Sequence, residues 1–231
     1  MIKRTLNLSK YLADTHLLFL GPRQTGKSTL LNEEFRESAF VINLLESDVF
    51  LALSKNPSLI RDMINETSQS IIIIDEVQKI PELLDEIHLI IEKKKQIKFI
   101  LTGSSARKLR KKGVNLLGGR VYPIYFHPLT SEELTKTEIS FHDFLLWGGI
   151  PSILLAKQKK MKMQAYIHLY LKEEILEEGL VRQIGPFSRF LDVAATMNTE
   201  QVDFSAVASD AQVSTKTVSN YFEILQDTLI G

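Results

Sequence analysis

The sequence predicts an α/β fold in which a parallel sheet flanked by helices is followed by a helical C-terminal part. Over roughly the first 135 residues, short apolar runs alternate with segments that carry helix signals, as in repeated strand–helix units. A glycine-rich loop directly follows the first apolar run, and no further strand is indicated after Thr130. These three observations set the expected fold class.

Five apolar runs have the length and aliphatic content of buried strands. Each is only four to six residues long, which favours strands over helices. The expected strands are residues 17–20, 40–44, 71–74, 97–101 and 121–126.

Helix signals separate these runs. Pro57 follows Asn56 as a first-turn proline follows an N-cap, and apolar residues then recur at helical spacing up to Ile64. Pro81 opens a second amphipathic segment, which ends in three lysines at residues 93–95 and so suits a helix C-terminus. We therefore expect a helix in each of these two segments.

The part of the chain beyond the expected sheet is predicted to be helical. Thr130 and Glu133 have the spacing of a capping box. Helix candidates follow, and Gly and Pro residues at 148–151 and 185–186 separate them. The candidates are residues 141–146, 166–180 and 187–197. We expect borders near residues 137 and 197, which give three parts: residues 1–137, 138–197 and 198–231.

Composition excludes several classes of protein. The chain has 231 residues, 28 Lys and Arg against 28 Asp and Glu, 44% hydrophobic residues and no cysteine. A formal net charge of zero argues against a strongly basic protein that coats nucleic acid and against an acidic disordered tail. Without cysteine there is no disulfide framework, thiolate metal site or cysteine nucleophile.

No segment is expected to enter a membrane. The longest aliphatic runs are far shorter than the ~20 apolar residues that span a bilayer. Lys3 and Arg4 mimic the charged start of a signal peptide, but polar residues interrupt the stretch that follows. The sequence therefore predicts a cytoplasmic protein.

The most informative motif is a phosphate-binding loop of the form G-x-x-x-x-G-K-[ST], which stands between an expected strand and an expected helix. Its glycines allow backbone N–H groups to turn toward phosphate oxygens, Lys27 supplies a cation, and Ser28 supplies a hydroxyl for Mg²⁺. The expected nucleotide-binding residues are Gly21, Pro22, Arg23, Gln24, Thr25, Gly26, Lys27, Ser28 and Thr29.

A pair of acids follows the third expected strand. Open parallel sheets bind ligands at the carboxyl ends of their strands, which is where Asp75 and Glu76 would lie. We expect Asp75 to hold Mg²⁺, through water, and Glu76 to polarise the water that attacks the γ-phosphate. A plain strand-to-helix turn is the alternative interpretation.

Small polar residues follow the fourth expected strand, at Thr102, Gly103, Ser104 and Ser105. The hydroxyl of Ser104 or Thr102 could orient the attacking water. The alternative for Ser104 or Ser105 is an N-cap of the helix that would follow.

Several segments together resemble a prokaryotic family of AAA+ type P-loop ATPases related to archaeal and signal-transduction ATPases. These segments are GPRQTGKST, IIIIDEVQKIPEL, KFILTGSSARKL, LLGGRVYPIYFHPLTSEEL and FLLWGGIP. The resemblance implies a five-stranded sheet in the order 5-1-4-3-2 in residues 1–137, a helical lid in 138–197, and a winged-helix-like module in 198–231. It also implies a C-terminal domain of unknown function, and members usually continue well past the length of this chain, so a truncated chain is expected.

The resemblance also implies an arginine finger, and Arg120 stands just before the fifth expected strand, where relatives place one. Such a cation could neutralise charge on the transferred phosphoryl group, in its own chain or from a neighbouring subunit. A surface arginine at the start of a strand is the alternative. Arg182 and Arg189 are candidate lid arginines.

Residues 204–225 have a helix-turn-helix pattern, with Val213 in the turn. DNA binding is only weakly supported, because residues 200–231 carry five acids against Lys216 alone. We favour docking of protein, either within the chain or from a partner. A basic cluster at residues 107–112 could bind phosphates instead, although such runs are usually a solvated face.

The leading hypothesis is therefore a module that binds ATP with Mg²⁺ and hydrolyses it, with Lys27, Glu76, Arg120 and Ser104 as catalytic candidates. The rival is a nucleotide-switched DNA- or protein-binding module with little hydrolysis. Nucleotide is expected as a partner in both, and a homo-oligomer or a partner protein is an open alternative.

Overall fold

The computed structural model describes residues 2–104, 117–169, 175–176, 181 and 183–228. Contacts divide the chain into two compact units, residues 1–151 and residues 152–231. The sequence predicts three parts with borders near residues 137 and 197, and this division stays a prediction.

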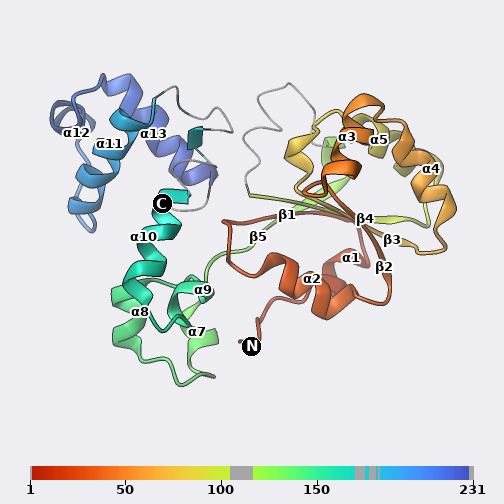
Figure 1. The fold of residues 1–231 in the computed structure, drawn as a ribbon, viewed down its shortest axis with the longest axis horizontal. Helices are drawn as coiled ribbons and strands as arrows, with labels where there is room; N and C mark the ends of the chain where they lie inside the picture. The colour runs from red at the N-terminus through yellow and green to blue at the C-terminus, as the bar shows by residue number, and fades with distance from the viewer. Residues whose placement is uncertain (1, 105–116, 170–174, 177–180, 182, 229–231) are drawn as a thin grey trace. The chain divides into compact units, whose positions relative to one another are not determined.

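The first unit is built on one five-stranded parallel sheet (Figure 1). Its order, β2-β3-β4-β1-β5, confirms the order 5-1-4-3-2. The strands are β1 (His16–Leu20), β2 (Ala39–Asn43), β3 (Ile71–Asp75), β4 (Lys98–Gly103) and β5 (Val121–Tyr125).

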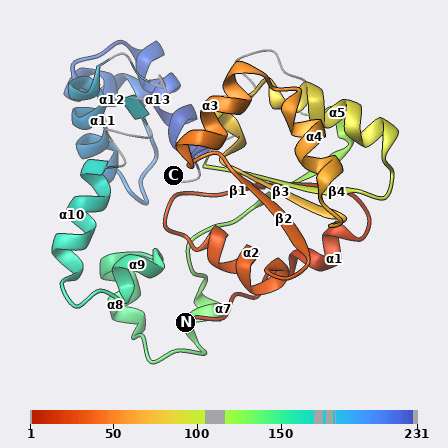
Figure 2. The same cartoon turned by 45° about the vertical axis from the view of Figure 1, so that its right-hand side comes forward.

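Helices cover both faces of this sheet (Figures 1 and 2). One face packs against α1 (Leu8–Leu12) and α2 (Lys27–Phe35). The other packs against α3 (Ser47–Lys55), α4 (Leu59–Glu66) and α5 (Leu83–Lys93). Because both faces of the central strands β1, β3 and β4 are buried, these strands carry continuous apolar runs, which the sequence shows. The edge strands β2 and β5 are more exposed.

The helix expected after Asn56 starts later than the proline suggests. The Asn56 side chain accepts hydrogen bonds from the Ser58 N–H (3.2 Å) and hydroxyl (2.7 Å), so it closes a turn, and α4 begins at Leu59. The prediction of Asn56 as the N-cap is therefore wrong by two residues.

Four short elements complete the described part of the first unit: the 3₁₀ turns η1 (Val77–Lys79) and η2 (Leu117–Gly119) and the helices α7 (Ser131–Leu134) and α8 (Phe141–Trp147). The capping box of Thr130 and Glu133 is confirmed at the start of α7. The short helix α9 (Pro151–Leu154) crosses the border between the two units.

The second unit is helical, with α10 (Lys159–Leu169), α11 (Ile184–Thr196), α12 (Phe204–Ala211) and α13 (Thr215–Asp227). The pair α12–α13 confirms the expected helix-turn-helix pattern, and Gln212 takes the left-handed conformation (φ 57°) at its turn. The Gly and Pro at 185–186, expected to break a helix, lie in the first turn of α11, where proline needs no N–H partner.

Rings from α11 and α13 form the core of this unit. Phe187 and Phe190 both contact Tyr221, with ring centroids 4.9 and 5.2 Å apart. Residues 229–231 of the expected winged-helix-like module, and most of the helix expected over 166–180, lie outside the described residues. Among the helices that the structure describes, none combines the length and apolar character needed to cross a membrane.

Candidate functional site

The phosphate-binding loop lies where the sequence predicts it, between the carboxyl end of β1 and the start of α2. At Gly21 the loop passes close to the backbone of Phe126, because a Cβ added to Gly21 would come within 2.3 Å of the Phe126 carbonyl oxygen. Gln24 (φ 62°) and Gly26 (φ 96°) both take left-handed conformations. These features fold the loop tightly over the N-terminus of α2.

Lys27 spans this loop from the first turn of α2. Its side chain is buried, and its Nζ donates hydrogen bonds to the carbonyl oxygens of Gly21 (2.5 Å) and Pro22 (2.9 Å). Thr25, also buried, donates from its hydroxyl to the same Pro22 oxygen (2.8 Å). The Lys27 side chain therefore joins the α2 end of the loop to the first two residues of the loop.

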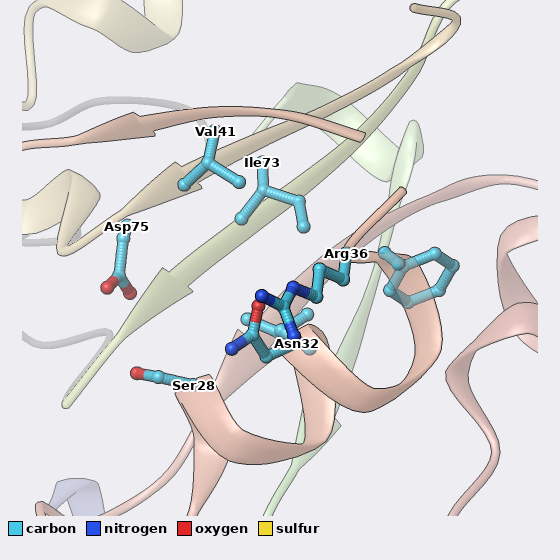
Figure 3. Close-up of a pocket in the computed structure, with 8 residues that line it drawn as sticks. Ser28, Asn32, Arg36, Val41, Ile73 and Asp75 are labelled. Carbon is cyan, nitrogen blue, oxygen red and sulfur yellow. The ribbon is translucent and has the colours of Figure 1, made fainter. Parts of the chain in front are cut away.

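Ser28 and Asp75 line one pocket of about 250 Å³. Figure 3 shows the two side chains at the same end of it, Ser28 from α2 and Asp75 from β3. The rest of the lining is Leu31, Asn32, Phe35, Arg36, Val41 and Ile73. The structure thus brings together the two residues expected to serve Mg²⁺.

Thr102 orients both acids. Its buried hydroxyl donates a hydrogen bond to Asp75 Oδ1 and accepts one from the Glu76 N–H (3.2 Å). Because this single O–H is engaged by Asp75, Thr102 acts on the acids, and the prediction that it could orient the attacking water loses support.

Glu76 is held in a conformation that few residues other than glycine adopt (φ 61°, ψ 44°). Such a backbone costs on the order of 1–3 kcal/mol and persists only where surrounding contacts fix it. Here the Thr102 hydroxyl accepts from the Glu76 N–H, and the Glu76 carbonyl oxygen accepts from the Lys79 N–H (2.9 Å). The Gln78 amide holds the Glu76 carboxylate.

Gln78 is a site residue to which the sequence analysis assigned no role. It is buried, and its Nε2 donates to Glu76 Oε2 (2.5 Å) and to Ser104 Oγ (3.3 Å). Since both neighbours accept, the amide nitrogen must face them. Among the described residues Gln78 Oε1 then has no partner, and it lies where a Cβ on Gly103 would meet it at 2.5 Å. Glycine at 103 makes room for this amide.

Arg120 is not brought to the site of its own chain. It stands before β5 and pairs with Glu92, through Nη2 (2.7 Å) and Nε (2.8 Å). Val121 lies beside His16 at the amino end of β1, whereas the loop follows Leu20 at the carboxyl end. Five residues of strand separate the two edges by about 16 Å. The structure therefore places Arg120 away from the loop of its own chain, and its role as an arginine finger stays a prediction.

Other candidates fall elsewhere. Arg189 lies on α11 of the second unit and donates to the Ala211 carbonyl (3.2 Å). Thr29 is exposed on α2. Arg182, Ser105 and the basic cluster at 107–112 lie outside the described residues.

A buried ion pair that the sequence does not predict lies beside the loop. Arg4 Nε donates to Glu133 Oε1 (2.9 Å), and the exposed fractions of the two side chains are 9% and 2%. Burial acts to raise the pKa of Glu133, but the hydrogen bond from Arg4, two backbone N–H groups and the guanidinium charge outweigh it and hold this pKa below its usual value.

This lowered pKa predicts an acid-dependent stability. At a pH between the folded and unfolded pKa values of Glu133, the unfolded chain binds more protons than the folded chain. Glu133 therefore contributes its full stabilisation above its unfolded pKa of about 4.5. This contribution is lost as the pH falls through the lower pKa of the folded state. Urea unfolding at pH 7 and pH 4 should show a smaller acid-dependent loss in Glu133→Gln than in the parent.

Glu92→Gln is the control, because Arg120 also lowers the pKa of Glu92 but that carboxylate is exposed. An exposed ion pair contributes little to the free energy of unfolding. Equal acid dependence in the parent and both variants would contradict the prediction.

The oxygen atoms of Ser28 and Asp75 suit a hard cation that also binds phosphate. Among the described residues no three His, Cys, Asp or Glu side chains gather as a metal cage. A serine hydroxyl and one carboxylate do meet at the pocket. Mg²⁺ commonly takes one or two protein oxygens and fills its remaining positions with water and substrate phosphate, so the residues present fit this ion.

The sequence matches a family described as AAA domain over residues 14–135, more than half of the chain. The chain belongs to the AAA domain family. Residues 138–231 match a domain of unknown function (DUF8612), which confirms that a domain of this kind follows the AAA domain.

Two curated relatives of this AAA-domain chain are uncharacterised proteins, Mb2031c of Mycobacterium bovis and Rv2008c of Mycobacterium tuberculosis. Each is 23% identical over 220 residues, which make up 93% of this chain and 48% of the relative. The chain therefore spans about half the length of the curated relatives it matches.

Solved structures with a similar fold include one on katanin self-assembly and one of the replication initiator DnaA bound to AMPPCP and single-stranded DNA. The first is 14% identical, with a TM-score of 0.41, and the match covers 92% of this chain and 78% of katanin. The second is 13% identical, with a TM-score of 0.42 and coverage of 98% and 90%. At such scores neither bears on the function of this AAA domain.

Proposed function

We propose that this chain binds ATP with Mg²⁺ and hydrolyses it. The observation that carries the proposal is the meeting of two motifs at one edge of the sheet. Ser28, next to Lys27 in the loop, and Asp75, next to Glu76 after β3, line the same pocket. An AAA domain match over these residues supports nucleotide as the ligand.

Each residue then has a role in phosphoryl transfer. Backbone N–H groups of the loop and Lys27 hold the phosphates, while Ser28 and Asp75 hold Mg²⁺, which when bound offsets phosphate charge. Glu76 takes a proton from water as the water oxygen bonds to the γ-phosphorus, and the bond to the bridging oxygen breaks to release ADP. Gln78 and Thr102 keep the two acids in place.

The rival proposal is a nucleotide-driven switch with little turnover. It is favoured by one observation, the position of Arg120 at the sheet edge opposite the loop, because an isolated chain then has no arginine finger from this residue. Single-turnover hydrolysis with Mg²⁺, scanned over protein concentration beside equilibrium nucleotide binding, separates the two proposals. Tight binding without turnover at every concentration favours the switch.

We propose that Arg120 acts on the site of a neighbouring copy. Arg120→Met should leave nucleotide affinity unchanged and remove the part of the hydrolysis rate that rises with protein concentration, since a phosphoryl-stabilising arginine supplied in trans contributes mainly to turnover. The control is Arg61→Met, which breaks another Arg–Glu pair of the first unit, with Glu86 (3.0 Å). A rate that Arg120→Met leaves unchanged at all concentrations would assign Arg120 to its pair with Glu92 alone.

For the second unit we propose protein docking by α12 and α13. The supporting observation is charge, because five acids stand against Lys216 over residues 200–231, whereas DNA binding needs cations near phosphates. Binding of duplex DNA that weakens steeply with rising salt would contradict this proposal.

A further inference from the structure

Arg4 contacts the phosphate-binding loop from outside the segment that matches the AAA domain. Its Nη1 donates a hydrogen bond to the Thr25 carbonyl oxygen (2.8 Å). Its Nη2 donates to the His127 carbonyl oxygen (2.8 Å), which lies just beyond β5. One guanidinium thus connects the loop to the chain that follows the edge strand.

The bond to Thr25 fixes a peptide plane that matters for anion binding. In a trans peptide the C=O of one residue and the N–H of the next point in opposite directions. With the Thr25 C=O held toward Arg4, the Gly26 N–H points away from Arg4. A charged donor on the carbonyl also polarises the peptide and strengthens its N–H as a donor. Arg4 therefore sets both the direction and the strength of one loop donor.

Arg4 also reaches the other end of the loop through Phe126. Its guanidinium carbon lies 3.7 Å from the centroid of the Phe126 ring. The backbone of Phe126 is the surface against which Gly21 packs, since a Cβ there would come within 2.3 Å of its carbonyl oxygen. Arg4 thereby supports the first residue of the loop as well as its fifth.

Glu133 keeps Arg4 in this position. Glu133 Oε1 accepts from Arg4 Nε and from the Thr5 N–H (2.9 Å each), while Oε2 accepts from the Thr130 N–H (3.0 Å). The carboxylate is buried and its pKa is lowered, so it stays charged opposite the guanidinium. A planar guanidinium can serve Glu133, Thr25 and His127 together, but a lysine ammonium offers no such fork.

We infer that Arg4 is a positioning residue for the phosphate-binding loop, which it presets for the phosphate groups that ADP and ATP share. The inference rests on the proposed nucleotide binding. Loop N–H groups cradle the α- and β-phosphates, so the effect of Arg4 falls on affinity for both nucleotides. The water-activating acids are held by other residues, so turnover of bound ATP depends little on Arg4.

The test compares Arg4→Met and Arg4→Lys with Arg61→Met, which loses a partly buried ion pair outside the site. Affinities for Mg-ADP and Mg-ATP should fall together by roughly tenfold or more in Arg4→Met, with kcat at saturation within about threefold of the parent. Arg4→Lys should not restore affinity, and Arg61→Met should bind as the parent does. Affinity is expressed per folded molecule, from thermal unfolding of each variant.

A readout without nucleotide separates this inference from the proposed function. Hydrogen exchange of peptides covering residues 21–28 should be faster in Arg4→Met than in the parent and unchanged in Arg61→Met. If the parent binds neither nucleotide, the proposed function fails, and loop exchange alone still decides whether Arg4 presets the loop. Parent-like exchange in Arg4→Met, parent-like affinity per folded molecule, or a loss confined to kcat would each overturn the inference.

Discussion

Glu76→Gln is expected to slow ATP hydrolysis by roughly 100- to 10,000-fold while Mg-ATP affinity stays within about threefold of the parent. The reason is that the glutamine amide keeps the shape of the carboxylate but cannot take a proton from water. The neighbouring contacts survive the change, because Gln78 Nε2 can donate to an amide oxygen as it does to Glu76 Oε2, and Thr102 still accepts from the backbone N–H.

Single-turnover hydrolysis with excess protein measures the rate free of product release, and a fluorescent nucleotide measures binding. Glu66→Gln, an exposed acid at the end of α4, is the control and should hydrolyse as the parent does. Turnover by Glu76→Gln at the parent rate would remove Glu76 from the mechanism. A parallel loss of affinity would instead assign it to nucleotide binding.

The sequence predicts the features that depend on short stretches of chain. All five strands appear within two residues of their expected ends. Burial on both faces makes the central strands β1, β3 and β4 continuous apolar runs. The loop at 21–28 and the acids Asp75 and Glu76 are also local signals, since each needs only a strand end and the residues that directly follow it.

What the sequence does not predict depends on contacts between distant residues. In the sequence Arg4 is only a charged residue near the N-terminus. In the structure its partners are Thr25, His127 and Glu133, which lie 21, 123 and 129 positions away along the chain. Gln78 is close to Glu76 in sequence, but its contact with Ser104 and the space left by Gly103 come from the neighbouring strand. Neither arrangement produces a periodic or spaced pattern that could be recognised beforehand.

Arg120 is a different kind of case, because the sheet topology already argues against its placement in the site of its own chain. In a parallel sheet the residue before a strand lies at the amino edge, while the phosphate-binding loop lies at the carboxyl edge. The register of Val121 beside His16 confirms that separation. Resemblance to relatives supplied the residue, and strand direction places it away from the loop of its own chain.

Lys27→Ala is expected to lower Mg-ATP affinity by roughly 100-fold or more, out of the range of a micromolar binding assay. A hydrogen bond between a charged donor and a phosphate contributes about 1.5–3 kcal/mol in exposed or half-buried sites, and 2.7 kcal/mol is already about 100-fold in affinity. Lys27 sits inside the loop with little access to water, where a cation acts on phosphate more strongly than it does in bulk solvent.

The substitution also removes the contacts of Nζ with the carbonyl oxygens of Gly21 and Pro22, so loss of loop structure must be separated from loss of charge. Lys27→Met keeps the length and packing of the side chain without its ammonium group, and Lys55→Ala at the exposed end of α3 is the control. Mg-ATP should raise the unfolding temperature of the parent and of Lys55→Ala, because a ligand stabilises only the state that binds it, and should leave both Lys27 variants unchanged.

The comparison of the two Lys27 variants decides what the cation does. If Lys27→Met folds as the parent does and still fails to bind, the ammonium charge holds the phosphates, and the backbone of a well-formed loop is not sufficient alone. If Lys27→Met binds Mg-ATP with parent affinity, the loop N–H groups and the N-terminus of α2 supply the binding energy, and Lys27 serves only to join the two ends of the loop. We expect the first result, because a triphosphate carries more negative charge than one helix terminus offsets.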